Sequence, residues 1–318
     1  MDGKFHNSIV KTLAYFDYFD HPLTATELYC FLFLPQHASY ADFIRELDKL
    51  EYKSSSIGFE RFNGFYFLRG RQDCVDIRRA KTVDNDRKNH LASKAVRKLR
   101  YAPFVRAVFI CNNTALEMAR PNSDIDVVII IKSGRLWIGR LLVTLILSVF
   151  RLRRTRHKIT NRICLSFYAT DKALDFSNLQ IAKPDIGLMY WIAQFTAIYD
   201  PNDIGQEIFN RNQWIRGYLP NALQINTMSG RFYTRDNWLS RVWKKFWEMA
   251  WGGTYGDLVE NQARLIQKAK MKRNLHSVQN EPDTRVVISD EILKFHENDR
   301  RLEYKEKWEA KVKEYLFN

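Results

Sequence analysis

One apolar run, led by two carboxylates, constrains the fold of this chain more than any other feature. The run is IDVVIII at 125–131, with Ser123 and Asp124 directly before it. A run of this composition predicts a buried strand. Side chains two residues apart in a strand point to the same side, so Asp124 and Asp126 are expected to converge. Two converging carboxylates repel each other unless a cation lies between them. The pair is therefore either a cation site or a surface turn that leads into a strand, and the two aspartates alone do not decide between these interpretations.

Strands and helices alternate around this run. Residues 104–111 and 163–170 are rich in β-branched and aromatic side chains and predict two further strands. A short helix at 114–119 and a long one at 135–150 are predicted between the strands. This order predicts an α+β fold with a mixed sheet and flanking helices at its centre.

The first 75 residues predict a separate module of three helices and a hairpin. Thr24 and Glu27 have the spacing of a capping box at the start of the second helix. Asn63 and Gly64 lie between two aromatic runs, and both tolerate the positive φ of a tight hairpin turn. Three helices and a two-stranded wing make a winged helix, which is expected either to bind nucleic acid or to serve in protein–protein contact or as a purely structural module. Its third helix, at 40–52, has at least as many acids as bases, which argues against contact with phosphates.

Three domains are predicted: a winged helix at 1–75, a sheet domain with a leading basic helix at 76–175, and a helical domain at 176–318. The apolar run at 186–200 is expected to be a helix of the third domain, which ends in a charged tail from residue 289. Trp238, Trp243 and Trp247 lie in a later helix of that domain and are expected to pack in its core, with a membrane-interface or base-stacking role as the alternative.

The formal net charge of +14 favours polyanionic partners, which include nucleic acid, nucleotide phosphates and an acidic membrane surface. The basic loop at 151–162 is expected either to bind a triphosphate or an RNA backbone, or to be solvated. The four cysteines show no metal-ligand spacing, which predicts reduced, buried thiols in a cytoplasmic protein. The apolar segment 141–150 is too short to cross a bilayer, so no stable membrane insertion is expected.

The block ARPNSDIDVVIII, with the strand and short helix before it, resembles the DNA polymerase beta superfamily of nucleotidyltransferases. The likeness is closest to the minimal and antibiotic-type transferases and covers about residues 100–172. The layout as a whole is similar to uncharacterised bacterial nucleotidyltransferase-domain proteins, which have a winged helix in front and helices behind. The resemblance implies transfer of a nucleoside monophosphate from an NTP to a hydroxyl acceptor that the sequence does not identify.

The resemblance also implies a set of site residues. Asp124 and Asp126 would hold Mg²⁺ or Mn²⁺ and form the catalytic pair. Asn112, Asn113 and Ser123 would contact the nucleotide, with Asn112 making the left-handed turn that glycine makes in the family.

The chain departs from the family pattern at several places. Asn112 and Asn113 replace a Gly-Ser pair, and Glu117 stands near the expected path of the triphosphate. The strand at 163–170, which should carry a third acid, has none on either side, and Asp171 lies just past its end. Two hypotheses therefore stay open: a Mg²⁺-dependent transferase weakened by these changes, and a degenerate transferase fold that binds nucleotide or nucleic acid as a regulator.

A third hypothesis, association with a membrane surface, is the weakest of the three. It would use the helix at 136–150 together with the basic loop. That helix has no polar face on which to lie at a membrane surface.

Overall fold

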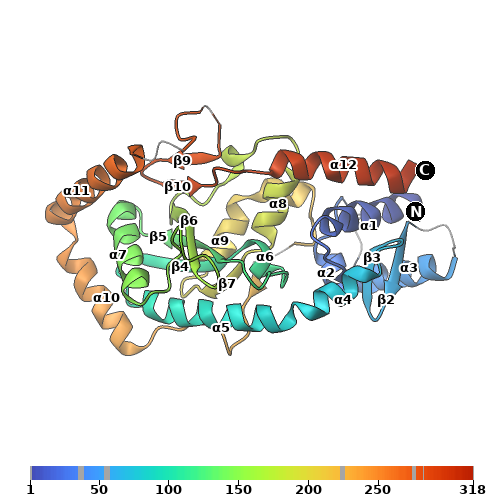
Figure 1. Ribbon diagram of the computed structural model, residues 1–318, viewed down its shortest axis with the longest axis horizontal. Coiled ribbons are helices and arrows are strands. Elements are labelled where there is room, and N and C mark those ends of the chain that lie inside the picture. Colours follow the sequence, from blue (N-terminus) through green and yellow to red (C-terminus); the bar gives the residue numbers. More distant parts are fainter. Residues whose placement is uncertain are drawn as a thin grey trace.

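The computed structural model describes residues 2–34, 39–53, 58–222, 226–273, 277–281 and 283–317. Within these residues the chain has an α+β fold with a mixed central sheet, as the sequence predicts. Figure 1 shows a small N-terminal module at one end and the central sheet in the middle. Two helices, α10 (Trp238–Ala250) and α11 (Gly253–Lys272), form the opposite end. None of the described helices is long and apolar enough to span a membrane.

The N-terminal module consists of three helices and a small antiparallel sheet. The predicted capping box is confirmed, because the Thr24 hydroxyl accepts from the backbone of Glu27 while the Glu27 carboxylate accepts from the backbone of Thr24. Asn63 and Gly64 turn the hairpin with φ angles of 52° and 82°. The elements of the N-terminal module are α1 (Asp2–Asp17), β1 (Leu23–Thr24), α2 (Ala25–Cys30), α3 (Tyr40–Lys53), β2 (Phe59–Phe62) and β3 (Phe65–Leu68).

Two helices, α4 (Asp73–Ala80) and α5 (Thr82–Leu99), connect the module to the central sheet and confirm the predicted basic helical stretch. One of their bases is not solvated. Lys88 on α5 is fully buried and donates to the carbonyl of Ser123 at 2.6 Å and to the Asn161 side chain at 3.0 Å. This lysine therefore anchors the turn that leads into Asp124.

The central sheet has seven strands within the part of the chain that the structure describes, in the order β8-β7-β4-β5-β6-β10-β9. The three strands predicted from sequence lie next to one another in its middle. The strand that follows the two carboxylates, β5, pairs in parallel with β6 and antiparallel with β4. The strands are β4 (Val105–Ile110), β5 (Ile125–Ile131), β6 (Ile163–Thr170), β7 (Thr196–Tyr199), β8 (Asn226–Thr227), β9 (Val286–Ile288) and β10 (Ile292–Phe295).

The prediction of a separate helical domain at 176–318 is wrong, because this region supplies four of these strands to the central sheet. β7 pairs with β4, and β10 pairs with β6, so both edges of the central sheet come from this part of the chain. The run at 186–200, predicted as one helix, is a helix followed by a strand. The apolar character of the run is continuous, so the sequence pattern does not show where the helix ends and the strand begins. The helices of this region are α8 (Ile186–Ala193), α9 (Ile204–Arg211), α10, α11 and α12 (Arg301–Phe317).

The two faces of the sheet bury different partners. One face packs with the N-terminal module and α8 in a single apolar cluster, in which the Tyr15 and Tyr190 rings stack at 4.1 Å. The other face packs against α5 and α7 (Leu136–Val149) through Trp137 and Tyr168, which are both buried. The N-terminal module therefore shares its core with the sheet, and a pocket lies where the two meet.

The expected core packing of three tryptophans is wrong for two of them. The side chains of Trp238 and Trp243 on α10 are 70% and 46% exposed. Trp247 is partly buried, and its ring lies 5.1 Å from that of Trp251. A sequence pattern shows that a helix has an apolar face, but it does not show whether that face meets the core.

Candidate functional site

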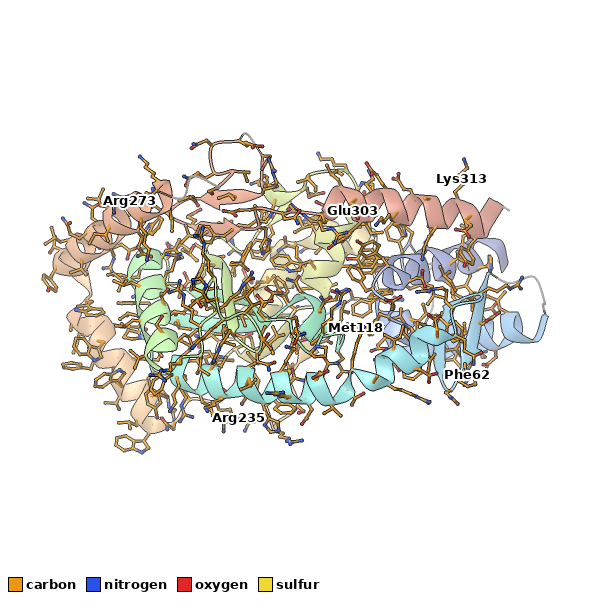
Figure 2. All side chains as sticks on the ribbon, in the orientation of Figure 1. Phe62, Met118, Arg235, Arg273, Glu303 and Lys313 are labelled. Carbon is orange, nitrogen blue, oxygen red and sulfur yellow. The ribbon has the colours of Figure 1, made fainter. Side chains whose placement is uncertain are left out.

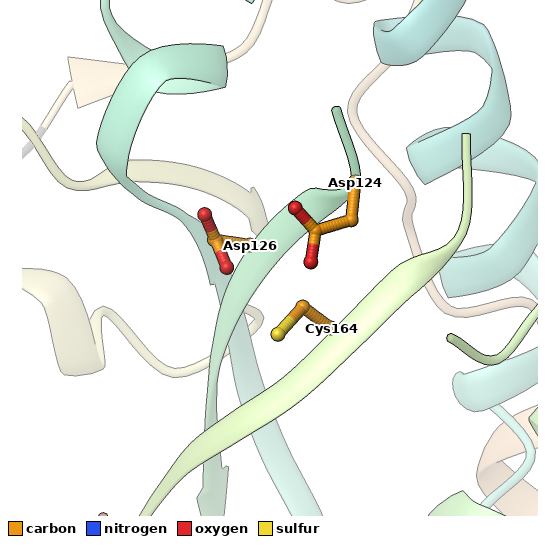
Figure 3. Close-up of side chains that lie close together, drawn as sticks. All are labelled: Asp124, Asp126 and Cys164. Atoms are coloured by element: carbon orange, nitrogen blue, oxygen red, sulfur yellow. The ribbon is translucent and has the colours of Figure 1, made fainter. Parts of the chain in front are cut away.

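Two carboxylates and a thiol meet where β5 begins. Ligand atoms of Asp124, Asp126 and Cys164 all lie within 4.8 Å of one another (Figure 3). The parallel register places Cys164 of β6 beside Asp126 of β5. The predicted convergence of the two aspartates is confirmed. Cys164 was not predicted as part of this site, because its position beside Asp126 depends on the register of β5 and β6, which the sequence does not show.

The charges at this point are unbalanced. Arg154 of the basic loop donates to Oδ2 of Asp124 at 2.6 Å and to the Cys164 sulfur at 3.5 Å. Burial raises the pKa of Asp126, and the neighbouring Asp124 raises it further, while a hydrogen bond with the Asn112 side chain opposes the change. Asp126 forms no ion pair with the residues that the structure describes. Arg154 is therefore paired with Asp124 alone, and the buried Lys88 attracts Asp124 without forming an ion pair.

Cys164 stands on β6, the strand where the family pattern has its third acid. Burial, followed by Asp126 and Asp124, raises the pKa of its thiol to about 12. At neutral pH the position therefore holds a protonated thiol and not a carboxylate. Asp171, the other candidate, lies beyond the far end of β6 and accepts from the backbone of Ser133 at 2.8 Å, so it does not reach this cluster.

A pocket of about 560 Å³ opens beside Asp126, between the N-terminal module, the sheet and the start of α12. Asn112, Asn113 and Ser123 also line it, so four of the five predicted site residues share one cavity. Asp124 does not line the pocket, and its carboxylate is paired with Arg154.

The turn before the pocket has the predicted backbone conformation. Asn112 has a φ of 55°, which confirms the expected left-handed turn. Asn112 is the first residue of the short helix α6 (Asn112–Ala115), which begins two residues earlier than the predicted helix at 114–119. Glu117 follows α6 and is mostly exposed, 3.8 Å from Arg78, and it does not line the pocket.

Two cations that the sequence did not single out also line the pocket. Lys81 lies between α4 and α5, and Arg120 lies in the loop before β5. Burial lowers the pKa of Lys81, and Arg120 lowers it further, whereas Asp20 raises it. Asp20 itself is paired with Arg71 at 2.5 Å. Two mutually repelling cations thus line the same pocket as Asn112, and a bound anion would relieve their repulsion.

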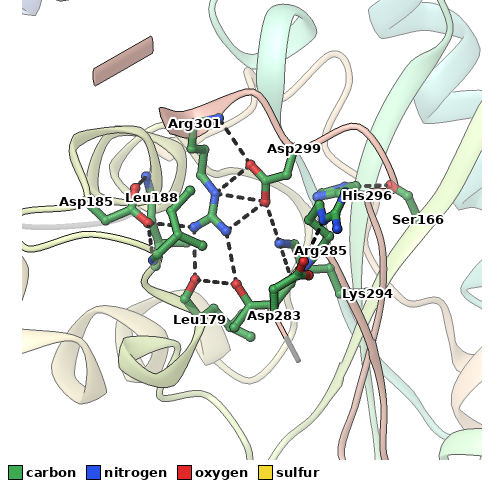
Figure 4. Close-up of polar contacts among 12 residues, drawn as sticks. Ser166, Leu179, Asp185, Leu188, Asp283, Arg285, Lys294, His296, Asp299 and Arg301 are labelled. Carbon is green, nitrogen blue, oxygen red and sulfur yellow. Dashed lines mark hydrogen bonds and ion pairs between the residues drawn. The ribbon is translucent and has the colours of Figure 1, made fainter. Parts of the chain in front are cut away.

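The opposite wall comes from β10 and the residues after it (Figure 4). Asp299 pairs with Lys294 at 2.9 Å and with Arg301 at 2.8 Å, and Arg301 also binds Asp185 at 2.8 Å. These four side chains are nearly or fully buried and form a closed cluster of two cations and two anions. Short β-branched runs on both sides of Asp290 were the one signal in the sequence that could have predicted the strands carrying this wall.

The basic loop at 151–162 is only partly solvated, with Arg156 and Lys158 exposed. Arg154 is engaged by Asp124, and Arg162 donates to the carbonyl of Arg151.

Comparisons with family models, curated proteins and solved structures gave no match.

Proposed function

We propose that the protein binds a nucleoside triphosphate together with a divalent cation in this pocket, as a nucleotidyltransferase. The observation that carries the proposal is the convergence of Asp124 and Asp126 at the edge of a cavity that Asn112, Asn113 and Ser123 also line. A volume of about 560 Å³ lies in the range of small-molecule sites. The resemblance to the polymerase beta superfamily points to the same residues.

The donor set fits the implied metal. Two carboxylates within 4.8 Å of each other offer the hard oxygen ligands that Mg²⁺ and Mn²⁺ prefer, and Arg154 engages only one oxygen of Asp124. Burial, followed by the neighbouring Asp124, raises the pKa of Asp126, and a bound cation would oppose both effects. When bound, the metal would neutralise triphosphate charge and orient the leaving pyrophosphate.

The chain's own residues would position the nucleotide. Lys81 and Arg120 present positive charge to the phosphates, and Asn112 and Asn113 offer amide donors beside them. Two partly exposed aromatic side chains, Tyr18 of the N-terminal module and Trp191 of α8, line the same pocket and would contact a base. The hydroxyl acceptor would enter from the open side, and the structure does not identify it.

A second function is favoured by two specific observations. Arg154 already pairs with Asp124 at 2.6 Å, and the position beside Asp126 on β6 holds a protonated thiol where a third acid would activate the acceptor hydroxyl. Both features favour binding of a nucleotide without transfer, which would make the protein a nucleotide-dependent regulator.

We interpret the N-terminal module as a winged helix, but its geometry favours nucleic-acid binding less than the pocket favours nucleotide. On α3, the helix that would enter a groove, Arg45 pairs with Asp42 and Lys49 pairs with Glu46. Cations that are paired with acids on their own helix contribute little to contact with a phosphate backbone.

Binding is tested by calorimetric titration of each NTP, with and without Mn²⁺, into the wild type and the variant with Asp124→Asn and Asp126→Asn together. We expect metal-dependent binding in the wild type and its loss in the double variant. Undiminished binding in the double variant would exclude the metal site. Transfer is tested with labelled NTP and with protein or RNA as acceptor.

The variant Cys164→Asp separates the two functions, with Cys164→Ser as its uncharged control. If a missing acid is what prevents transfer, Cys164→Asp gains transfer activity and Cys164→Ser does not. If both variants bind NTP as the wild type does and neither transfers, the regulator function is the better account.

A further inference from the structure

The helix α10 is amphipathic in the reverse of the usual sense, because its polar side faces the protein. Glu248 pairs with Arg106 of β4 at 2.8 Å and accepts from the backbone of Phe104. Lys244 donates to the carbonyl of Val105 and to the Tyr199 hydroxyl, both at 2.8 Å. These buried contacts fix the rotation of α10 about its own axis, so the opposite side of the helix must face outward.

The side of α10 that faces outward is apolar and aromatic. Its exposed fractions run from 46% for Trp243 to 73% for Met249. Soluble proteins seldom expose so many large apolar side chains on one helix without a partner. This outer face consists of Trp238, Leu239, Val242, Trp243, Phe246 and Met249.

Two neighbouring helices also expose large apolar side chains. Leu258, Leu265 and Ile266 on α11 are more than half exposed, as are Leu145 and Val149 on α7. Figure 1 shows these three helices together at the end of the molecule away from the N-terminal module. In Figure 2, side chains along α10 and α11 project away from the rest of the protein, and Arg273 marks the end of α11.

The charges on α10 decide between the partners that such a surface could take. Arg241 and Lys245 are exposed beside the outer face, and the only acid of α10, Glu248, is turned inward onto Arg106. A second copy of the chain would bring the same cations together and add its own net charge of +14, which opposes association. Tryptophan and phenylalanine next to lysine and arginine, without acids, are typical of helices that lie in the surface of an anionic membrane.

We propose that α10, extended by the apolar side chains of α7 and α11, binds the surface of a membrane that contains anionic lipid. The helix lies in the plane of the surface, with its outer face in the apolar region and Arg241 and Lys245 at the headgroups. On the opposite side of α10, Lys244 and Glu248 bind the rest of the protein. This binding is independent of the nucleotide pocket.

The proposal is tested by sedimentation of the whole chain with vesicles of phosphatidylglycerol and phosphatidylcholine, compared with vesicles of phosphatidylcholine alone. We expect binding to the anionic vesicles, a blue shift of tryptophan fluorescence, and weaker binding as salt rises, because exposed charges are screened. The variant with Trp243→Glu and Phe246→Glu should bind at least roughly tenfold more weakly. Val83→Glu, at an exposed apolar position on α5, should bind as the wild type does.

Charge reversal adds a second measurement. Arg241→Glu with Lys245→Glu should weaken binding to anionic vesicles and keep the thermal unfolding midpoint of the wild type, because both side chains are exposed. Vesicle binding that neither pair of substitutions weakens would overturn the proposal. The proposal would also be overturned if the wild type does not bind vesicles and instead dimerises through this face. Light scattering would show such a dimer in the wild type and its loss in the Trp243→Glu, Phe246→Glu variant.

Discussion

Two buried groups of charged side chains line or adjoin one pocket, and they differ in how their charges are balanced. The closed cluster of Lys294, Asp299, Arg301 and Asp185 matches two cations with two anions. At the open cluster, where Asp124, Asp126 and a buried thiol, Cys164, meet, only Asp124 is ion-paired, with the partly exposed Arg154. The buried Lys88 attracts Asp124 without pairing with it.

The pKa directions follow this difference. Arg301 and Lys294 hold the pKa of Asp299 far below its usual range, although burial alone would raise it. Burial and Asp124 raise the pKa of Asp126. The closed cluster stabilises the fold without a ligand. In the open cluster the two carboxylates repel each other, and a bound cation would remove this repulsion.

The largest effect is expected from opening the closed cluster. Asp299→Asn leaves Lys294, whose side chain is only 5% exposed, without a carboxylate partner. We expect the free energy of unfolding to fall by about 3–5 kcal/mol, measured by urea denaturation. Glu207→Gln breaks the exposed Arg211–Glu207 pair and should cost at most about 1 kcal/mol. Equal losses in the two variants would mean that the closed cluster is not structural.

The next effect concerns the open cluster. Asp126→Asn should leave the apo protein at least as stable as the wild type, because it removes a carboxylate that burial and Asp124 disfavour. The wild type should gain about 2.7 kcal/mol at a metal concentration one hundred times its dissociation constant, and the variant should gain nothing. Asp200→Asn alters another carboxylate with a raised pKa, one that caps α9, and should leave the metal effect unchanged. A metal-dependent shift of the unfolding midpoint in Asp126→Asn would place the cation elsewhere.

A third effect comes from His296, which lies between the two clusters and contacts the Ser166 hydroxyl at 3.2 Å. Burial, followed by Lys294, lowers its pKa from 6.5 to about 4. In the unfolded chain this histidine is protonated below pH 6.5, whereas in the folded protein it is protonated only below about pH 4. The free energy of unfolding therefore falls as the pH is lowered through this window. His296→Gln should reduce that loss by about 2 kcal/mol in denaturation curves measured from pH 7 to 4. Parallel curves for the two proteins would contradict the assignment.

The smallest effect is expected at Arg154, which is 43% exposed. Arg154→Gln frees the Asp124 carboxylate and should raise metal affinity about two- to fivefold, since exposed ion pairs contribute less than about 1 kcal/mol. Arg156→Gln removes the same charge from the basic loop without a contact to Asp124. Metal titration of both variants should show a gain only in the first, and a loss of affinity in Arg154→Gln would mean that the arginine helps to form the site.

Local signals in the sequence predicted the elements that local interactions determine. The Thr24 capping box and the Asn63-Gly64 turn are found as expected, and the alternation in a strand placed Asp124 and Asp126 on one spot. The strand β7 was missed because Thr196–Tyr199 continues the apolar run of α8, where periodicity does not separate a helix from a buried strand.

The missing parts of the site depend on long-range pairing. Lys294 and His296 reach the pocket only because β10 pairs with β6, and Cys164 faces Asp126 only in the observed register of β5 and β6. A single sequence carries no signal for either pairing. The same holds for Trp243, whose exposure follows from the inward contacts of Lys244 and Glu248.

The most direct test of the central claim is the position of Mn²⁺ in crystals grown with an NTP, located by its anomalous scattering. The account predicts one Mn²⁺ coordinated by both Asp124 and Asp126, with phosphate oxygens in the pocket beside Asn112 and with Asp124 released at least in part from Arg154. A nucleotide bound without metal at these carboxylates, or an Asp124–Arg154 pair left unchanged with no ion beside Asp126, would contradict it.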